Sequence, residues 1–160
     1  MNSPKFIGVA LIVAPLVGLL LKFFSFGWMV VFMLFGPIFV MASGYIIQII
    51  IAAQGFFSSN SLFDEKRLKR ATIAAQATIA GILVLGFTMP DGGDNDRGST
   101  LQVMFGAYGP NAQSVLAATD WLTNLLALVA AIAWIVGWCW LAVEWIGAFA
   151  DRRKRQLGMA

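Results

Sequence analysis

The sequence predicts an all-α integral membrane protein with four transmembrane helices and with both chain ends in the cytoplasm. Three observations lead to this prediction. Hydrophobic residues make up 59% of the 160 residues and charged residues only 12%, a balance outside the range of soluble globular chains. The apolar residues form runs long enough to cross a bilayer. The basic residues gather in blocks beside those runs, as in the flanks of membrane spans, and the length fits a single four-helix domain over 1–160.

The apolar run over 6–53 predicts two helices. As one helix it would be roughly 70 Å long, more than twice the ~30 Å hydrocarbon core of a bilayer. Polar residues and a glycine interrupt the run just before Trp28, whose indole is a typical anchor at the membrane surface. We therefore expect spans at about 6–24 and 28–53, with a bend in the second span at Gly36–Pro37.

Two further spans are expected at about 71–89 and 121–146. Ser61 and Asp64 have the spacing of a capping box, so the third helix should begin with them, outside the membrane. Thr119 and Asp120 should cap the fourth helix, because their side chains satisfy free amides at a helix N-terminus. The segments between and after the spans are a cytoplasmic loop at 54–70, an extracytoplasmic loop of about 30 residues at 90–120 and a cytoplasmic tail at 147–160.

Two basic blocks predict the orientation. Nine of the 11 Lys and Arg residues fall on the side of the termini, and only Lys22 and Arg97 fall on the other side. The positive-inside rule then places the termini in the cytoplasm, and we expect the plasma membrane of a bacterium. A specific site for anionic lipid head groups is the alternative use of these blocks. The blocks consist of Lys66, Arg67, Lys69, Arg70, Arg152, Arg153, Lys154 and Arg155.

The residue inventory argues against several classes of function. The chain has no histidine and one cysteine, Cys139, so the usual ligand sets for haem, zinc, copper and iron–sulfur clusters cannot be assembled, and we expect no cofactor and no metal. A nucleophile with a histidine base is excluded on the same ground, so we expect no enzyme and no catalytic residue. The basic residues flank membrane spans and do not cover a face, so nucleic acid is not expected as a partner.

Charged and amide side chains close to the spans are interpreted as structural. Lys22 should snorkel to the outer surface, and Glu144 should lie at the inner boundary. Glu144 could otherwise be a proton or cation site, but the sequence offers it no partner at the bilayer midplane. Gln48, Gln76 and Asn124 should form hydrogen bonds between helices.

Stripes of small residues predict close helix packing in the third and first spans. Small side chains let two backbones approach, which matters in lipid because apolar burial does not drive helices together there. The stripes could face each other or a foreign helix. They consist of Ala71, Ala74, Thr78 and Gly81 in the third span and Ala10, Ala14 and Gly18 in the first.

Aromatic and apolar residues in the fourth span and the outer loop are candidates for partner contact. Trp134, Trp138 and Trp145 share one face of the fourth span, although bundle packing and an aromatic belt would also explain them. The loop places apolar side chains at helical spacing, and an amphipathic helix there could dock onto a protein or the membrane surface. These loop residues are Leu101, Phe105 and Tyr108, together with Met104. Asp94, Asp96 and Gly98 fit a calcium loop poorly, because a glycine stands in place of the third acidic ligand, and this segment, with Asp91, is interpreted as a solvated turn.

The function that these features favour is that of a non-catalytic accessory subunit in a larger membrane complex. Its partners would be the lipid bilayer and either other membrane subunits or copies of itself. The alternative is a homo-oligomeric pore or small transporter, including a holin-like pore, with a path lined by Gln48, Gln76 and the bent second span.

Overall fold

The computed structural model describes residues 3–25, 27–28, 31–32, 35, 37–58, 61–92 and 97–157, and most of them are helical. Four helical segments are long and apolar enough to cross a membrane, which agrees with a multi-pass membrane protein. They are α1 (Pro4–Lys22) with the short helix η1 (Phe23–Ser25), α3 (Pro37–Ala52) with the π-helical turn η2 (Ala53–Phe57), α4 (Glu65–Thr88) and α6 (Ala112–Gln156). The strands β1 (Asp91–Gly92) and β2 (Arg97–Gly98), which pair antiparallel, and the helix α5 (Thr100–Met104) lie between α4 and α6.

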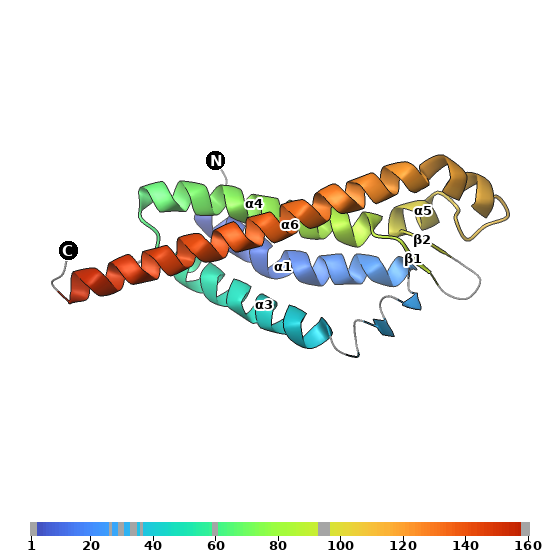
Figure 1. Ribbon diagram of the computed structural model, residues 1–160. Coiled ribbons are helices and arrows are strands. Elements are labelled where there is room, and N and C mark those ends of the chain that lie inside the picture. The colour runs from blue at the N-terminus through green and yellow to red at the C-terminus, as the bar shows by residue number, and fades with distance from the viewer. Residues whose placement is uncertain are drawn as a thin grey trace.

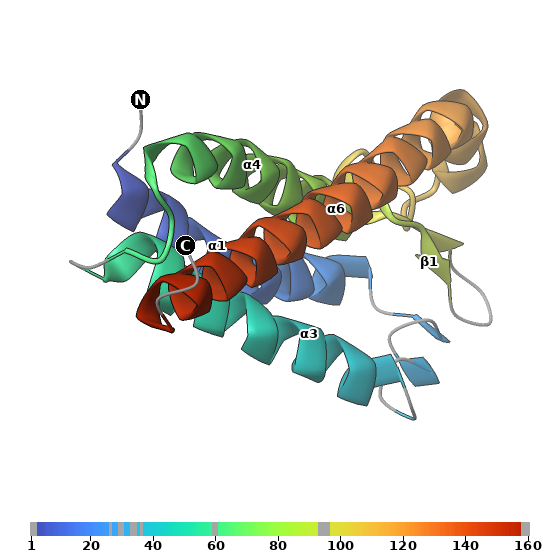
Figure 2. The same cartoon turned by 60° about the vertical axis from the view of Figure 1, so that its left-hand side comes forward.

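Helix α4 packs against both α1 and α6 (Figures 1 and 2). Small residues explain how closely these helices pack. A Cβ added to Gly81 of α4 would lie 2.5 Å from the amide nitrogen of Trp134 on α6, and one added to Gly86 would lie 2.5 Å from the carbonyl oxygen of Gly18 on α1. The backbones therefore approach each other through glycines, as in tightly packed membrane helices.

Helix α3 packs mainly on α1. The hydroxyl of Tyr45 donates to the carbonyl oxygen of Ile12 at 2.8 Å, and Nε2 of Gln48 donates to that of Leu11 at 2.6 Å. The first two turns of α3, residues 37–43, are exposed on every side. The helix begins at Pro37, a residue well suited to a first turn, and Gly36 lies outside the described residues.

Helix α4 begins after Asp64, so the expected start at a Ser61 cap is wrong. Asp64 is the N-cap, and its Oδ1 accepts a hydrogen bond from the amide of Arg67 at 2.8 Å. Ser61 has other partners, because its hydroxyl donates to the carbonyl oxygen of Gly55 and accepts from the amide of Phe63. The serine thus closes the turn between η2 and α4.

Helix α6 begins at Ala112, so the prediction that Thr119 and Asp120 cap this helix is wrong. Both residues lie inside a continuous helix of 45 residues, which is about 67 Å long and extends beyond a ~30 Å hydrocarbon core. No proline lies between Ala112 and Gln156, so nothing in this segment forces a break. The hydroxyl of Thr119 donates to the carbonyl oxygen of Val115 one turn earlier, inside the helix.

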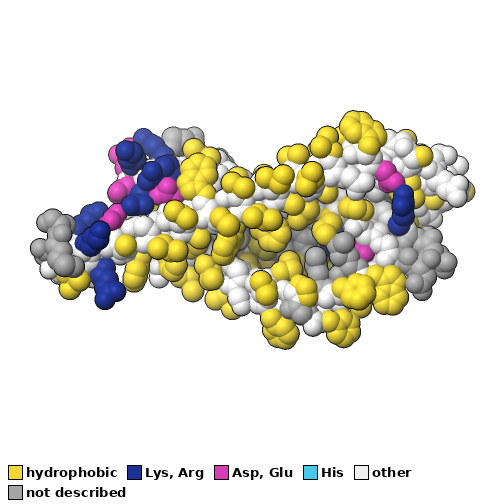
Figure 3. Space-filling view, viewed as in Figure 1, with side chains coloured by type: hydrophobic (Ala, Val, Ile, Leu, Met, Phe, Trp, Pro, Cys, Tyr) yellow, Lys and Arg dark blue, Asp and Glu magenta, His cyan; other side chains and the backbone are white. Residues whose placement is uncertain are grey.

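Charged side chains lie at the two ends of the molecule, and apolar side chains cover the visible face between them (Figure 3). The start of α1, the connection into α4 and the end of α6 lie at one end, which we call the Arg67 end, while β1, β2 and α5 lie at the other (Figure 1). Along α4, Arg67 and Met89 are about 33 Å apart at 1.5 Å per residue. That separation is close to the thickness of a hydrocarbon core.

Candidate functional site

A cluster of four charged side chains, here called the Glu144 cluster, joins α4 to α6 at the Arg67 end. Oε2 of Glu144 lies 3.2 Å from Nη1 of Arg67, and Oε1 lies 3.0 Å from Nε of Arg70. Nη2 of Arg67 also lies 2.6 Å from Oδ2 of Asp151, about two turns after Glu144 on the same face of α6. Trp140 adds a hydrogen bond from its indole nitrogen to Glu144 at 3.3 Å.

The Glu144 carboxylate is buried, with 5% of the residue exposed, and two guanidinium groups surround it. Gly147 makes this arrangement possible, because a Cβ there would lie 2.7 Å from Nη1 of Arg67. The carboxylate is therefore a bridge between helices, with partners from the basic block at the start of α4. Glu144 is the buried member of the cluster, whereas the Arg70 and Asp151 side chains are partly exposed, so the loss of the Glu144 carboxylate would weaken the contact between α4 and α6 most.

A second polar network, here called the Lys22 network, lies at the opposite end. Nζ of Lys22 donates to the carbonyl oxygen of Met89 at 2.7 Å and to the hydroxyl of Ser25 at 3.1 Å, and it lies 3.9 Å from Oδ2 of Asp91. Ser25 and Thr100 share a hydrogen bond of 3.2 Å. The ammonium group thus satisfies a carbonyl at the end of α4, where the helix dipole favours a cation.

The expectation that Lys22 snorkels to the surface is wrong. Only 7% of the residue is exposed, because α1, η1 and the end of α4 enclose it. Thr100 extends the network, since its hydroxyl donates to the carbonyl oxygen of Leu21 at 2.6 Å. The network therefore ties the segment around α5 to α1 and α4.

The segment between α4 and α6 is ordered by further polar contacts. Ser99 and Gln102 form a capping box at the start of α5. Nε2 of Gln102 also donates to the side chains of Thr119 and Asp120 at 3.0 and 2.8 Å, and Arg97 pairs with Asp120 at 2.6 Å. These contacts fix α5 to the first turns of α6. Thr119 and Asp120, which were expected to act as caps, instead bond sideways to α5 and β2.

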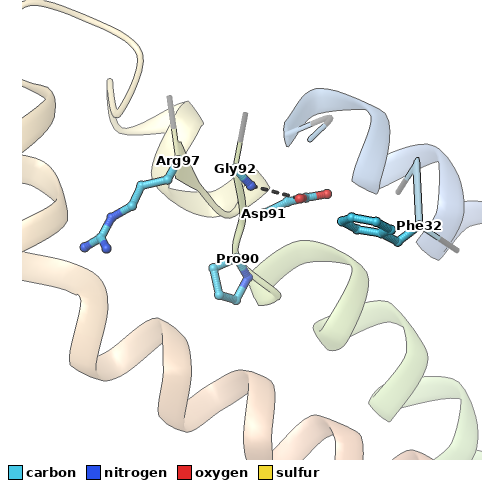
Figure 4. Close-up of a pocket in the computed structure, with 5 residues that line it drawn as sticks. All are labelled: Phe32, Pro90, Asp91, Gly92 and Arg97. Atoms are coloured by element: carbon cyan, nitrogen blue, oxygen red, sulfur yellow. Dashed lines mark hydrogen bonds between the residues drawn. The ribbon is translucent and has the colours of Figure 1, made fainter. Parts of the chain in front are cut away.

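A cavity of about 400 Å³ lies beside the strand pair and is lined by Phe32, Pro90, Asp91, Gly92 and Arg97. In Figure 4, the carboxylate of Asp91 accepts a hydrogen bond from the amide of Gly92 at 2.8 Å, and the Phe32 ring lies next to it. Arg97 points away from Asp91, toward α6. Asp94 and Asp96 lie outside the described residues, and among the described residues no group of three acidic or cysteine side chains could hold a metal ion.

The small-residue stripes face helices of the same chain. Ala71, Ala74, Thr78 and Gly81 are all buried, and a Cβ added to Gly137 of α6 would lie 2.8 Å from the amide nitrogen of Thr78. The stripe of α4 thus faces α6. In the stripe of α1, Ala14 and Gly18 are buried and Ala10 is half-buried. Gly18 lies against Ile82 and Gly86 of α4.

The residues proposed for partner contact differ in exposure. Trp134, Trp138 and Trp145 are half-buried, and the indole of Trp145 donates to Oε1 of Gln54 at 2.9 Å, so part of this face packs within the chain. In the outer segment, Phe105 and Tyr108 are exposed while Leu101 is half-buried.

The residues of the two basic blocks also differ in exposure and in their partners. Arg67 and Arg70 belong to the Glu144 cluster, whereas Lys66 is exposed and Lys69 forms a surface pair with Glu65 at 3.1 Å. Arg70 is also exposed despite its pair with Glu144, and the remaining exposed members are Arg152, Arg153, Lys154 and Arg155, at the end of α6.

The three amide side chains have unlike environments. Gln48 is buried and bonded to α1, whereas Gln76 on α4 and Asn124 on α6 are exposed. Within one copy of the chain, the two glutamines therefore do not line a common path.

Sequence reasoning missed the pairing of the charges, although it noted most of the charged residues. Arg67 lies just before the expected start of the third span and Glu144 just before the expected end of the fourth, so two antiparallel spans place them at similar depth. Lys22 and Asp91 likewise both lie close to the expected ends of the first and third spans. A comparison of the expected depths of the charged residues in the membrane could have found both networks. The contributions of Ser25 and Thr100 could not have been found in this way.

Comparison of the chain with protein-family models, with curated proteins and with solved structures gives no match. The function must therefore be argued from the residues and their geometry.

Proposed function

We propose that the chain is a non-catalytic structural subunit of a larger assembly in the cell membrane, with the Arg67 end in the cytoplasm. The plasma membrane of a bacterium remains the proposed location. The proposal has three parts, which are the orientation, the role of the buried polar groups and the surface offered to a partner.

The distribution of basic residues supports the orientation. The Arg67 end carries Lys5 and both basic blocks, whereas Lys22 and Arg97 are the Lys and Arg residues of the other end. Each basic residue near an anionic leaflet contributes about 1 kcal/mol, so the asymmetry strongly favours one orientation.

The state of the buried polar groups is the observation that carries the structural role. Among the described residues, no buried side-chain nitrogen or oxygen lacks a hydrogen-bond partner. The charged ones are used to join α1, α4, α5 and α6 to one another, as the Glu144 cluster and the Lys22 network illustrate. Polar groups that hold helices together favour a scaffold over a site for chemistry.

The first half of α3 supports assembly with a partner helix. Residues 37–43 are exposed on all sides, and Phe39 and Val40 have exposed fractions of 75% and 77%. Ala42, Ser43 and Gly44 follow in sequence and provide small side chains, which let a foreign backbone approach. The outer segment offers a second exposed surface at Met104 and Phe105.

Site-specific photo-crosslinking in native membranes tests the proposal. A photoreactive residue at Val40 should crosslink to a different membrane polypeptide, identified by mass spectrometry of the covalent product. The matched control is Ile73 on α4, which is also an exposed β-branched position in a membrane helix. A product of twice the chain's own mass from Val40 would favour the homo-oligomeric alternative. Equal yields from Val40 and Ile73, or none from either, would contradict a partner on α3.

A further inference from the structure

A small polar cavity lies between the start of α4 and the end of α6, beside the Glu144 cluster. Its volume is about 200 Å³. It lies at the Arg67 end, where the charged side chains gather next to the apolar surface (Figure 3). The residues that line it are Ser61, Leu62, Phe63, Asp64, Arg67, Ala148, Asp151, Arg152 and Arg155.

Two arginines of α6 face this cavity because of their helical spacing. Ala148, Arg152 and Arg155 lie four and three residues apart, so they share one face of α6. Arg153 and Lys154 lie between them in sequence but do not line the cavity. The basic tail of α6 thus presents two of its four cations to the cavity and the other two elsewhere.

The charge balance inside the cavity leaves these two arginines without a counterion. The carboxylate of Asp151 is paired with Arg67 at 2.6 Å, and that of Asp64 accepts from the amide of Arg67 at 2.8 Å. Both acidic groups of the lining therefore already have partners. Within the described part of the chain, neither Arg152 nor Arg155 takes part in an ion pair.

We propose that this cavity binds the phosphate group of an anionic lipid head group, held by Arg152 and Arg155. Guanidinium groups bind phosphate oxygens through paired, charge-assisted hydrogen bonds. The position next to the apolar band is where lipid phosphates lie, although free phosphate has the same recognition chemistry.

The test compares two variants of the full chain that lose the same charge. R152Q/R155Q removes the arginines of the cavity, and R153Q/K154Q removes their neighbours in sequence. All four side chains are exposed at the end of α6, so both variants should be as stable as the parent protein. Each is reconstituted in phosphatidylcholine nanodiscs with and without phosphatidylglycerol, and bound lipid is measured by native mass spectrometry.

We expect R152Q/R155Q to bind phosphatidylglycerol at least about tenfold more weakly than R153Q/K154Q, because only the first variant loses the paired hydrogen bonds. Equal weakening in the two variants would mean diffuse charge attraction and would overturn the site. Inorganic phosphate added to nanodiscs of phosphatidylcholine alone identifies the source. If inorganic phosphate binds and its binding depends on Arg152 and Arg155, while phosphatidylglycerol is not retained in the lipid experiment, then the ligand is free phosphate and not the lipid.

Discussion

Helix α3 together with η2 is as apolar as helix α4, yet the two segments are packed very differently. Helix α4 packs against both α1 and α6 and buries a stripe of small residues, whereas α3 contacts mainly α1 and exposes its first two turns completely. Apolarity therefore explains why both helices suit a membrane but not where they lie in the bundle.

Side-chain size and paired polar groups account for the difference. In lipid, apolar surfaces gain nothing by leaving their solvent, so close contact and hydrogen bonds decide which helices associate. Helix α4 has glycine at the contacts with both neighbours and a polar network at each end. Helix α3 begins with bulky residues such as Phe39 and Val40 and has Tyr45 and Gln48 as its polar links to α1.

The largest effect is expected from Glu144→Ala, which breaks the α4–α6 lock. Arg67 keeps its pair with Asp151 and the Arg70 side chain is 45% exposed, so solvent offsets part of the loss of the carboxylate. The free energy of unfolding should therefore fall by about 2–3 kcal/mol, at or below the lower end for a broken buried pair. Denaturant titration of the full chain in bicelles measures it. Glu65→Ala is the matched control, because its pair with Lys69 is solvent-exposed and should change the free energy by less than about 0.5 kcal/mol. Equal effects of the two substitutions would contradict a buried lock.

Gly81→Ala should be the next most destabilising change. Its methyl group would lie 2.5 Å from the amide nitrogen of Trp134 and 2.7 Å from the carbonyl oxygen of Ala130, so α4 and α6 must move apart. Overpacking of this kind costs about 2 kcal/mol. The same titration measures the change, and an unaltered stability would mean that the two backbones are not in close contact.

Gln48→Leu should weaken the link between α3 and α1. The substitution keeps a similar size but removes the 2.6 Å hydrogen bond to the carbonyl oxygen of Leu11. Hydrogen bonds between membrane helices contribute up to about 1 kcal/mol, so the loss should be of that order. Gln76→Leu, at an exposed position of α4, should leave stability unchanged in a parallel titration. A larger loss of stability from Gln76→Leu than from Gln48→Leu would contradict the conclusion that Gln48 is buried against α1 and Gln76 is exposed.

The smallest effect is expected from Gly44→Ala in α3. A Cβ there would lie 3.9 Å from the Trp138 ring, an ordinary contact. Alanine also favours a helix over glycine, so stability should stay within about 0.5 kcal/mol of the parent or rise slightly. If Gly44→Ala costs as much as Gly81→Ala, then α3 is packed as closely as α4 and the comparison between them fails.

The sequence was sufficient to predict helices able to cross a membrane, because length and apolarity are properties of the segments themselves. It was insufficient for boundaries that depend on contacts far along the chain. Asp120 has the chemistry of a cap but bonds to Gln102 of α5 from within α6. Lys22 has the stem of a snorkelling side chain, yet the end of α4 supplies an acceptor that keeps it buried. Such partners become visible only when the spans are placed side by side.

We propose that the Arg67 end and the end that carries β1, β2 and α5 lie at opposite surfaces of one membrane, with the Arg67 end in the cytoplasm. Single cysteines placed by Lys66→Cys, Arg153→Cys and Gln113→Cys in a Cys139→Ser background test it directly, since all three positions are exposed. A membrane-impermeant maleimide applied to intact cells should label only the cysteine at position 113, and the other two should react after permeabilisation. Labelling of positions 66 and 153 from opposite sides, or of 113 and 66 from the same side, would contradict it.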